Sequence, residues 1–522
     1  MGEPRHRLVA VGDSLSQGFQ SFAIYNTAIS YPAMIATKLG LSDQQFLYPK
    51  YSRFAGAPDF MGPALNLEYM ARTAGDNDCT DRSPVEMMEL GVNALKVAVE
   101  IHLHWDDHSR IDELGLDQVT EEIDIVHNLA VAGFDVGDLT QRTADTDRAT
   151  LKRWAEFTDL GPIATNARAL ISLPVLKTAR RNGRFMSTVE AAQVLGEEGG
   201  IETLIILIGA NNALGTVLTM DIRESGPGFD SPAAKGQYNL WRPVDFETEF
   251  DKLSAEIGKV KAKHVVWGTV PHVTAAPLAH GIRGRSEANP QFFNYYTYPW
   301  IPEDSFDSAF DPNLTGEQAM HIDEYIDSYN RIIRATVDQA SSSNLSWHVV
   351  DVCKLMDRFA YRRYWDPDEP RLEDVRRNCG IGGADYASVL PPVLQHVTAK
   401  GRLQASPDDP IRPPDSRFFR SAGKVRLEGG LVALDGVHPS TIGYGVIAQA
   451  FLDVMGEVGV DVGDGKIDFG DLVAKDSLVS DPPPCVNPDL KGLGWGEIGW
   501  DWVSGLAKTL NRPHARHWRF IE

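Results

Sequence analysis

The stretch Leu8-Val9-Ala10-Val11-Gly12-Asp13-Ser14-Leu15 decides the fold class. An apolar run followed by Gly-Asp-Ser predicts a buried strand that ends in a tight turn. Similar apolar runs recur further along the chain, at residues 123–131, 203–208, 264–270 and 347–352. Helical stretches lie between these runs, and strands that alternate with helices predict an α/β fold with a mainly parallel central sheet.

Helix signals support this alternation. Ser30 and Pro32 suit the start of a helix over about residues 30–39. Ser187-Thr188-Val189-Glu190 has the pattern of a capping box, which predicts the start of a second helix. A third helix is predicted from Ser440 to about Met455, because apolar residues there follow a helical spacing and Gly456 can end it.

The long stretches between these elements are expected to be excursions from one core, because core elements continue on both sides of each. We therefore predict one domain over residues 1–456 and a C-terminal extension, 457–522, that packs on it. Within the domain we expect insertions at about residues 41–120, 140–186, 215–262, 276–320 and 353–430.

The chain has 522 residues, of which 72 are acidic and 50 are basic, so its net charge is −22. Such an acidic chain is a poor candidate for nucleic-acid binding, because phosphate contacts need clustered Lys and Arg. No apolar run reaches the roughly 18 residues that span a bilayer, so no transmembrane segment is expected. No signal peptide is visible, which favours the cytoplasm, although a secreted protein without its signal would look the same. The sequence does not decide the oligomeric state.

Two candidate reactive segments lie far apart in the sequence. Ser14 follows the first strand, and the carboxyl end of a parallel strand is where α/β folds carry reactive groups. Asp435 precedes His438 by three residues, so its carboxylate can accept a hydrogen bond from Nδ1–H and leave Nε2 free as a general base. Taken singly, each segment has a plain alternative: Ser14 as a helix cap, and Asp435–His438 as a surface turn.

Two further residues can contribute hydrogen-bond donors. Asn211 follows the run 203–208, and a carboxamide at a strand end can donate to a developing oxyanion. Gly133 follows the run 123–131, and a glycine there lets a backbone N–H approach a ligand closely. Each of them alone is also compatible with an ordinary turn.

Together these segments resemble the SGNH hydrolases, also called the GDSL esterase/lipase family. Gly12-Asp13-Ser14-Leu15 is similar to the first family block, Gly133 to the second, Asn211 to the third, and Asp435 with His438 to the last. The resemblance covers under half of the chain. It departs from the family at Asn212, which stands where the third block usually has Asp. No Gly-x-Ser-x-Gly motif occurs, which argues against the α/β-hydrolase nucleophile elbow.

The resemblance implies a three-layer α/β/α sandwich of flavodoxin-like type, elaborated by long insertions. It implies Ser14 as nucleophile, His438 as base, and Asp435 as the group that orients the imidazole. Ser14 and Gly133 N–H groups and the Asn211 side chain would form the oxyanion hole. The implied activity is hydrolysis of carboxylic esters, of lipids or other acyl groups, through an acyl-enzyme on Ser14, with no cofactor and no metal. An acetyl-ester (carbohydrate) esterase, an acyltransferase of the same fold and a non-hydrolytic binding protein stay open as alternatives.

Three other features approach metal-binding patterns, but none of them fits such a pattern fully. His102-Leu103-His104-Trp105-Asp106-Asp107-His108 approaches a metal-binding pattern, but the extra Asp shifts its last His, so we interpret it as a solvated loop or lid. Residues 461–471 approach a calcium loop, but valines would occupy two ligand positions, so turns are predicted. The cysteines form no Cys-x-x-Cys pair, so neither a zinc site nor a disulfide framework is expected, and a single bridge stays open: Cys79, Cys353, Cys379 and Cys485.

Aromatic and apolar stretches offer candidate substrate contacts. Phe60 and Met61 belong to an apolar segment with several Gly and Pro residues, which predicts a wall or lid over the acyl site or, alternatively, a cover for the sheet edge. Residues 292–300 are rich in aromatic side chains, and packing of an insertion on the core is the favoured interpretation. The Trp-rich tail after residue 490 is expected to dock on the main domain, with contact to a membrane surface as the alternative.

Overall fold

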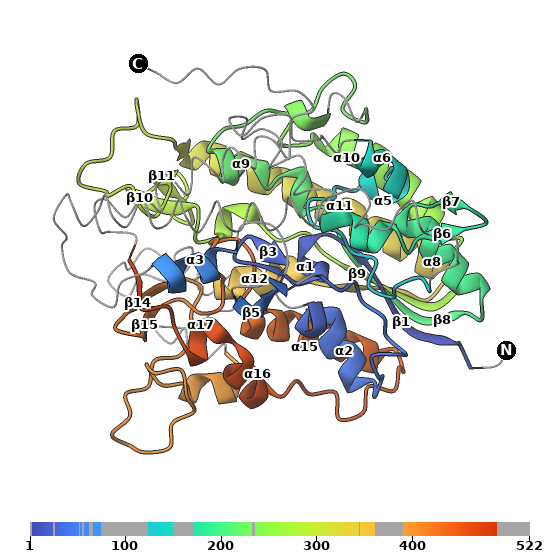
Figure 1. Ribbon diagram of the computed structural model, residues 1–522. Coiled ribbons are helices and arrows are strands. Elements are labelled where there is room, and N and C mark those ends of the chain that lie inside the picture. The colour runs from blue at the N-terminus through green and yellow to red at the C-terminus, as the bar shows by residue number, and fades with distance from the viewer. Residues whose placement is uncertain are drawn as a thin grey trace, which may run out of the picture.

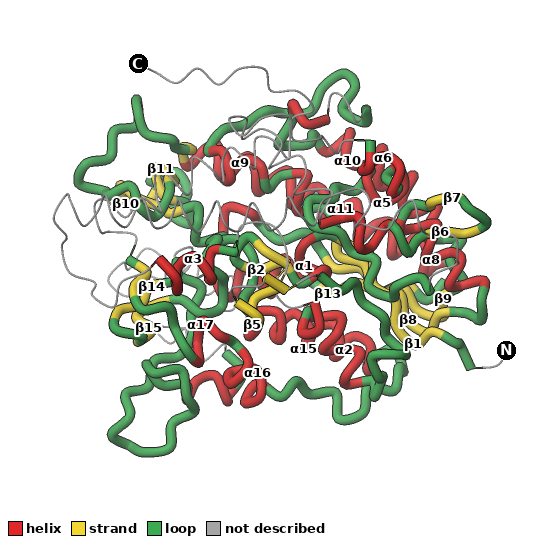
Figure 2. The backbone as a smooth tube through the Cα atoms, viewed as in Figure 1, coloured by secondary structure: helices red, strands yellow, loops and turns green. Residues whose placement is uncertain are grey.

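The computed structural model describes most of the chain. The described residues are 3–24, 27–51, 53–54, 57–61, 66–74, 124–149, 171–231, 235–343, 345–360 and 390–487. Figure 1 follows the chain by colour, and Figure 2 separates its helices, strands and loops.

A parallel sheet of four strands lies at the centre of the described chain. Its strands are β1 (His6–Gly12), β8 (Ile201–Leu207), β9 (Ala262–Gly268) and β13 (Trp347–Val350), and they lie in that order. The register pairs Val9 with Leu204, and Val265 with both Leu204 and Trp347. The expected α/β class with a parallel central sheet is therefore confirmed.

Helices cover both faces of this sheet. Alternate side chains of a strand point to opposite faces, so each strand contributes to two cores. Val9 and Val11 of β1 belong to a core that also contains residues of α8, α10 and α11, whereas Leu8 and Ala10 belong to a second core with α2 and α15. In Figure 1 these two groups of helices lie on opposite sides of β1, β8 and β9. A strand buried on both faces has an apolar run without polar alternation, as residues 8–11 do.

The helices account for much of the remaining described chain. Their bounds are α1 (Ser14–Gln17), α2 (Tyr31–Lys38), α3 (Leu67–Ala74), α5 (Asp138–Gln141), α6 (Ala144–Arg148), α8 (Thr188–Glu197), α9 (Gly215–Thr219), α10 (Pro243–Ile257), α11 (Gly316–Ser342), α12 (Val352–Phe359), α15 (Thr441–Glu457), α16 (Phe469–Lys475) and α17 (Ser477–Ser480). The three helices predicted from caps are α2, α8 and α15. The capping box of Ser187 and Glu190 is present, and Ser440 accepts from the Gly443 N–H.

Shorter strands form separate two- and three-stranded sheets outside the central sheet. They are β2 (Phe19–Gln20), β3 (Ala23–Ile24), β4 (Arg53–Phe54), β5 (Ala57–Met61), β6 (Arg180–Arg181), β7 (Arg184–Phe185), β10 (His280–Arg285), β11 (Phe293–Thr297), β12 (Leu314–Thr315), β14 (Arg420–Ala422), β15 (Val425–Glu428) and β16 (Cys485–Val486). The aromatic residues at 292–300 lie in and beside β11, where Phe292, Tyr296 and Tyr298 are buried in the first core.

Two sequence expectations need correction. Residues 123–131 were expected to form a strand, but in their described part only Asn128 bridges to Ala10 of β1. Backbone hydrogen bonds still join Ala10 to His127 and Leu129, and Val131 N to Gly12 O, so this segment runs beside β1. The Asn128 side chain also donates to Ser16 O of α1. The expected insertion at 215–262 contains α10, whose Phe246 packs in the first core, so this part belongs to the core.

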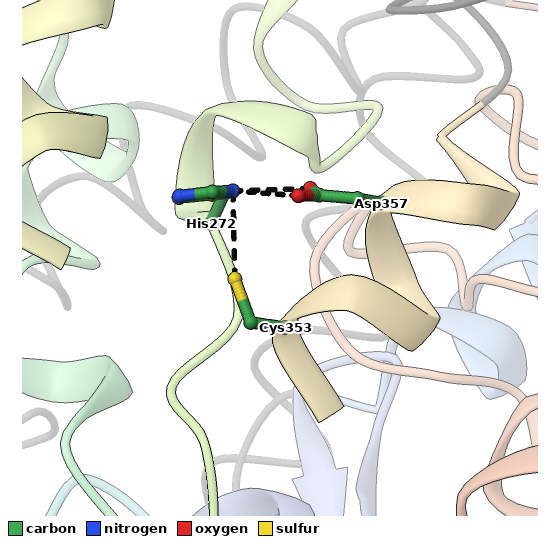
Figure 3. Close-up of side chains that lie close together, drawn as sticks. All are labelled: His272, Cys353 and Asp357. Carbon is green, nitrogen blue, oxygen red and sulfur yellow. Dashed lines mark hydrogen bonds and ion pairs between the residues drawn. The ribbon is translucent and has the colours of Figure 1, made fainter. Parts of the chain in front are cut away.

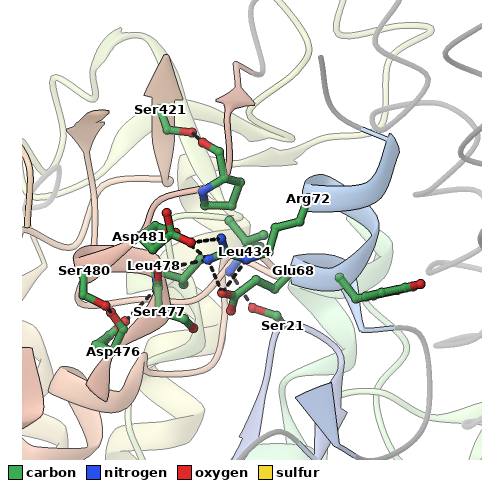
Figure 4. Close-up of polar contacts among 12 residues, drawn as sticks. Ser21, Glu68, Arg72, Ser421, Leu434, Asp476, Ser477, Leu478, Ser480 and Asp481 are labelled. Atoms are coloured by element: carbon green, nitrogen blue, oxygen red, sulfur yellow. Dashed lines mark hydrogen bonds and ion pairs between the residues drawn. The ribbon is translucent and has the colours of Figure 1, made fainter. Parts of the chain in front are cut away.

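The described part of the C-terminal extension contacts the rest of the chain closely. Phe469 and Leu472 of α16 lie in the second core with α15, and β16 pairs with β14. Arg72 of α3 donates to Glu68 and to the Ser477 and Asp481 carbonyls, which ties α3 to the region of α17 (Figure 4). None of the helices in the described part of the chain is long and apolar enough to cross a membrane.

Candidate active site

Ser14 lies at the point where β1 gives way to α1. Asp13 caps this short helix, because its carboxylate accepts a hydrogen bond from Leu15 N at 3.0 Å. Ser14 is the first helical residue and is only 5% exposed. The turn requires glycine before it, since a Cβ on Gly12 would lie 2.3 Å from the Leu207 carbonyl oxygen of the neighbouring strand.

Asp435 and His438 lie on the loop that leads into α15. The Asp435 carboxylate accepts hydrogen bonds from the Val437 and His438 N–H groups at 2.9 and 2.8 Å, and from Phe22 N at 3.1 Å. Its Oδ2 also lies 3.0 Å from Nδ1 of His438. These bonds hold the carboxylate and fix the orientation of the imidazole.

The structure brings Ser14, His438 and Asp435 together, and we call these three residues the Ser14 cluster. Nε2 of His438 lies 2.9 Å from the Ser14 Oγ, on the side of the ring opposite Asp435. An imidazole that donates Nδ1–H to a carboxylate presents Nε2 as an acceptor, so it can take the hydroxyl proton. The Phe19 ring packs against His438, with ring centroids 4.8 Å apart.

Two buried carboxyl groups in this region have opposite pKa shifts. Burial alone would raise the pKa of Asp435, but the charge of His438 and the hydrogen bonds to its oxygens outweigh burial and lower it. Asp13 has fewer such partners, and burial raises its pKa to about 7. Asp435 is therefore suited to remain a carboxylate beside the imidazole.

Gly133 and Asn211 lie on loops that contact each other. Gly133 adopts a φ of +81°, which favours glycine, and the next residue, Phe134, accepts a hydrogen bond from Asn211 Nδ2 at 2.8 Å. An amide group carries two N–H bonds, so this contact leaves one for another acceptor. Asn212, the departure from the family pattern, accepts from Val136 N at 3.3 Å and so holds the same pair of loops.

An apolar pocket lies beside the Ser14 cluster. Ser14 and His438 line it together with Leu15 and mostly aliphatic residues, and it contains roughly 940 Å³ of unfilled space, part of it open to solvent. Its walls come from the segment after β9, from α12, and from the start of α15, including Val273, Ala276, Met356, Phe359, Val446 and Ile447. Sequence reasoning missed these walls.

The structure does not test whether Phe60 and Met61 form a wall of the acyl site. Phe60 and Met61 lie in β5, which pairs with β4, but their side chains are outside the described part of the structure. Their contact with substrate therefore stays a prediction. The segment His102–His108 and the Trp-rich tail also lie outside the described residues. Turns were predicted for residues 461–471: residues 461–468 form turns and loops, but 469–471 belong to α16.

A second group of ligand-type side chains lies near the pocket: His272, Cys353 and Asp357, which we call the His272 cluster. Burial alone would lower the pKa of His272, but surrounding carboxylates, beginning with Asp323, raise it. Burial raises the pKa of the Cys353 thiol. Cys353 is a free cysteine, whereas Cys485 is disulfide-bonded.

Comparisons with known proteins give no family for this chain. No protein-family model matches it, and no curated protein matches it either.

Proposed function

We propose that the protein is a serine esterase of the SGNH hydrolase type, acting on carboxylic esters with an apolar acyl group. The observation that carries the proposal is the hydrogen-bonded series from Ser14 Oγ to His438 Nε2 at 2.9 Å and from His438 Nδ1 to Asp435 at 3.0 Å. The helices on both faces of a parallel sheet are compatible with the three-layer, flavodoxin-like sandwich of that family.

The geometry supports a two-step acyl transfer. His438 accepts the Ser14 proton at Nε2 while Oγ attacks the ester carbonyl carbon. His438 then returns this proton to the leaving alcohol, and the acyl group stays on Ser14. In the second step His438 deprotonates a water molecule, which attacks the acyl-enzyme and frees the serine. Asp435 stabilises the imidazolium in both steps, and its lowered pKa suits that role.

The oxyanion of each tetrahedral intermediate needs preorganised donors. We assign this role to the backbone N–H groups of Ser14 and Gly133 and to the Asn211 side chain. The hydrogen bond from Asn211 to the Phe134 carbonyl supports the assignment, because it anchors this amide to the loop that carries Gly133.

The pocket favours an acyl chain longer than acetyl. A site for an acetyl-sugar would need polar groups for the sugar hydroxyls, but the residues around Ser14 and His438 are mostly aliphatic. Each CH₂ group that leaves water for such a pocket stabilises the complex by about 0.8 kcal/mol.

A fluorophosphonate probe tests the proposal directly, because it reacts covalently with an activated serine hydroxyl. We expect one probe per chain, located on Ser14 by peptide mass spectrometry, and loss of p-nitrophenyl ester hydrolysis in step with labelling. The matched blank is Ser14→Ala, which should take up no probe. Labelling of another serine, or full ester turnover in the labelled protein, would contradict the proposal.

A further inference from the structure

The His272 cluster joins the ends of two neighbouring strands of the central sheet. His272 lies in the segment after β9, and Cys353 and Asp357 lie one turn apart on α12, directly after β13. Thr269 fixes the two segments to each other, since its hydroxyl accepts from Cys353 N at 2.9 Å and donates to Asp351 at 3.1 Å. The three side chains point toward one another in Figure 3.

Both partners of His272 in this cluster face the same ring nitrogen. Nδ1 lies 3.5 Å from the Cys353 Sγ and 2.9 and 3.1 Å from the two Asp357 oxygens. A Cys-His-Asp relay needs the thiol and the orienting carboxylate on opposite nitrogens, so Cys353 and Asp357 cannot share His272 in that way. Three ligand atoms converging on one point suit a cation instead.

The distances agree with a tetrahedral zinc site. Zinc lies about 2.3 Å from sulfur and about 2.0–2.1 Å from nitrogen, so two such ligands at a tetrahedral angle are about 3.5 Å apart. The observed separation of Cys353 Sγ and His272 Nδ1 is 3.5 Å. The nitrogen–oxygen pair would be about 3.3 Å apart on zinc. The observed distances from Nδ1 to the Asp357 oxygens are 2.9 and 3.1 Å, and the ligand atoms of all three side chains lie within 4.8 Å of one another.

The surrounding charges also favour a cation. Asp327 of α11 lies 3.4 Å from the other ring nitrogen of His272, where it can accept Nε2–H. A carboxylate that accepts from the far nitrogen of a metal-bound imidazole is a common partner in zinc sites, because it fixes the tautomer. Asp323 is buried nearby, where Thr274 donates to it at 2.6 Å.

We propose that the His272 cluster is a zinc site, with His272 Nδ1, Cys353 Sγ and an Asp357 oxygen as the three protein ligands and an exchangeable water in the fourth position. Zinc would replace the protons on His272 Nδ1 and on the Cys353 thiol, so binding releases both protons to solvent. Thiolate, imidazole and carboxylate are ligands that zinc accepts together.

Zinc at this position would connect two walls of the apolar pocket. One wall contains His272 and its neighbours Val273 and Ala276. The other wall is α12, which contributes Met356 and Phe359. The ion would therefore hold α12 against the segment after β9. This inference does not depend on ester hydrolysis, so its test reads metal binding and not turnover.

The test uses the full chain, freed of metal with a chelator, separated from that chelator and kept without reductant so that the Cys485 disulfide survives. Zinc titrated by calorimetry should bind with a stoichiometry of one, and the midpoint of thermal unfolding should rise with zinc. Cobalt in place of zinc should give a near-ultraviolet thiolate-to-cobalt absorption band. Absence of stoichiometric zinc binding, or a cobalt complex without that band, would overturn the proposal.

Variants assign the ligands. Cys353→Ser should abolish the cobalt band and weaken zinc binding by more than the roughly 10–100-fold that losing an outer-shell partner costs. Asp357→Asn should weaken zinc binding while keeping the band. The matched control is His321→Asn, which breaks another histidine–carboxylate contact, 2.8 Å to Glu224, without a cysteine nearby. If His321→Asn weakened binding as much as Cys353→Ser, or if Cys353→Ser kept the band, the ion would lie elsewhere.

Discussion

The Ser14 cluster and the His272 cluster contain similar side chains but join them through different atoms. In the Ser14 cluster, the two ring nitrogens of His438 face different partners: Nδ1 faces Asp435 and Nε2 faces Ser14. In the His272 cluster, Cys353 and Asp357 both face Nδ1. In the first arrangement Nε2 can accept and return a proton while Asp435 stabilises the imidazolium at Nδ1, whereas the second gathers ligand atoms around one point.

This difference shows that residue types alone do not identify a catalytic set. A hydroxyl or thiol, an imidazole and a carboxylate occur in both clusters, and both border the same pocket, through Ser14 and His438 in one case and His272 in the other. Which nitrogen each partner faces decides whether proton transfer or cation binding is the supported chemistry.

The largest expected effect comes from removing the proposed nucleophile. Ser14→Ala should lower kcat for p-nitrophenyl esters by roughly 10³-fold or more, because no other group in the cluster can carry the acyl chain. Initial rates of the folded variant measure this. Ser342→Ala, an exposed serine in the last turn of α11, is the matched control and should keep wild-type rates. If a Ser14→Ala variant kept more than a few percent of wild-type turnover, Ser14 would not be the nucleophile, and the Ser14 cluster would not differ from the His272 cluster in supporting catalysis.

The Ser14 cluster could be predicted from sequence because its members belong to short local patterns. Ser14 follows an apolar run directly, and Asp435 and His438 share one loop three residues apart. The same reasoning could have found the His272 cluster, since His272 and Cys353 each follow a predicted strand and the carboxyl ends of neighbouring parallel strands lie together. The sequence did not show that those two strands are neighbours.

The pocket could not be predicted, because its walls have no shared local pattern. Ala276 lies on a loop, Met356 on α12 and Val446 on α15, and only the packing of these segments brings them to Ser14. The strand expected at 123–131 is present only in part. Its apolar residues are buried, and Leu129 and Val131 donate backbone hydrogen bonds to β1, but the pairing amounts to one isolated bridge between Asn128 and Ala10.

Asp13 lies beside the Ser14 cluster but outside it, and its carboxyl group is more deeply buried than that of Asp357 in the His272 cluster. Asp13, beside Ser14, is fully buried and has a pKa raised from 3.8 to about 7, whereas the side chain of Asp357 is 16% exposed. A raised pKa means that the folded state holds a proton that the unfolded state has already lost. The contribution of Asp13 to stability is therefore present below pH 3.8 and is lost as pH rises through about 7.

Asp13→Asn should remove this pH dependence while keeping the cap, because an Asn oxygen can still accept from Leu15 N. Between pH 4 and pH 8 the free energy of unfolding of the variant should gain on wild type by at most about 4 kcal/mol. Urea unfolding of both proteins across this range measures the difference. The raised pKa of Asp476 affects both proteins equally and cancels. A constant difference would mean that Asp13 does not titrate in this range.

The third prediction concerns the oxyanion hole proposed beside the Ser14 cluster. The zinc site proposed for the His272 cluster involves no such group. Asn211→Ala should lower kcat by about 10²–10³-fold with little change in KM, because the oxyanion develops in the transition state. Asn294→Ala is a matched control: its amide also donates to a backbone carbonyl, that of Arg283 at 2.7 Å, but it lies exposed on β11. If both variants had wild-type kcat, Asn211 would act only through its bond to Phe134.

The smallest expected effect concerns the pocket that the two clusters share. Ala276 lies on the wall that follows His272, and Ala276→Phe should fill space that an acyl chain would occupy. Each CH₂ that can no longer be buried costs about 0.8 kcal/mol, or about fourfold in kcat/KM, so octanoyl esters should lose more than butyryl esters and acetyl esters least. Ala335→Phe, on an exposed position of α11, is the matched control and should leave the chain-length profile unchanged. Equal losses for all three esters in Ala276→Phe would show that acyl chains bind elsewhere, and the segment of Phe60 and Met61 would then be the first place to look.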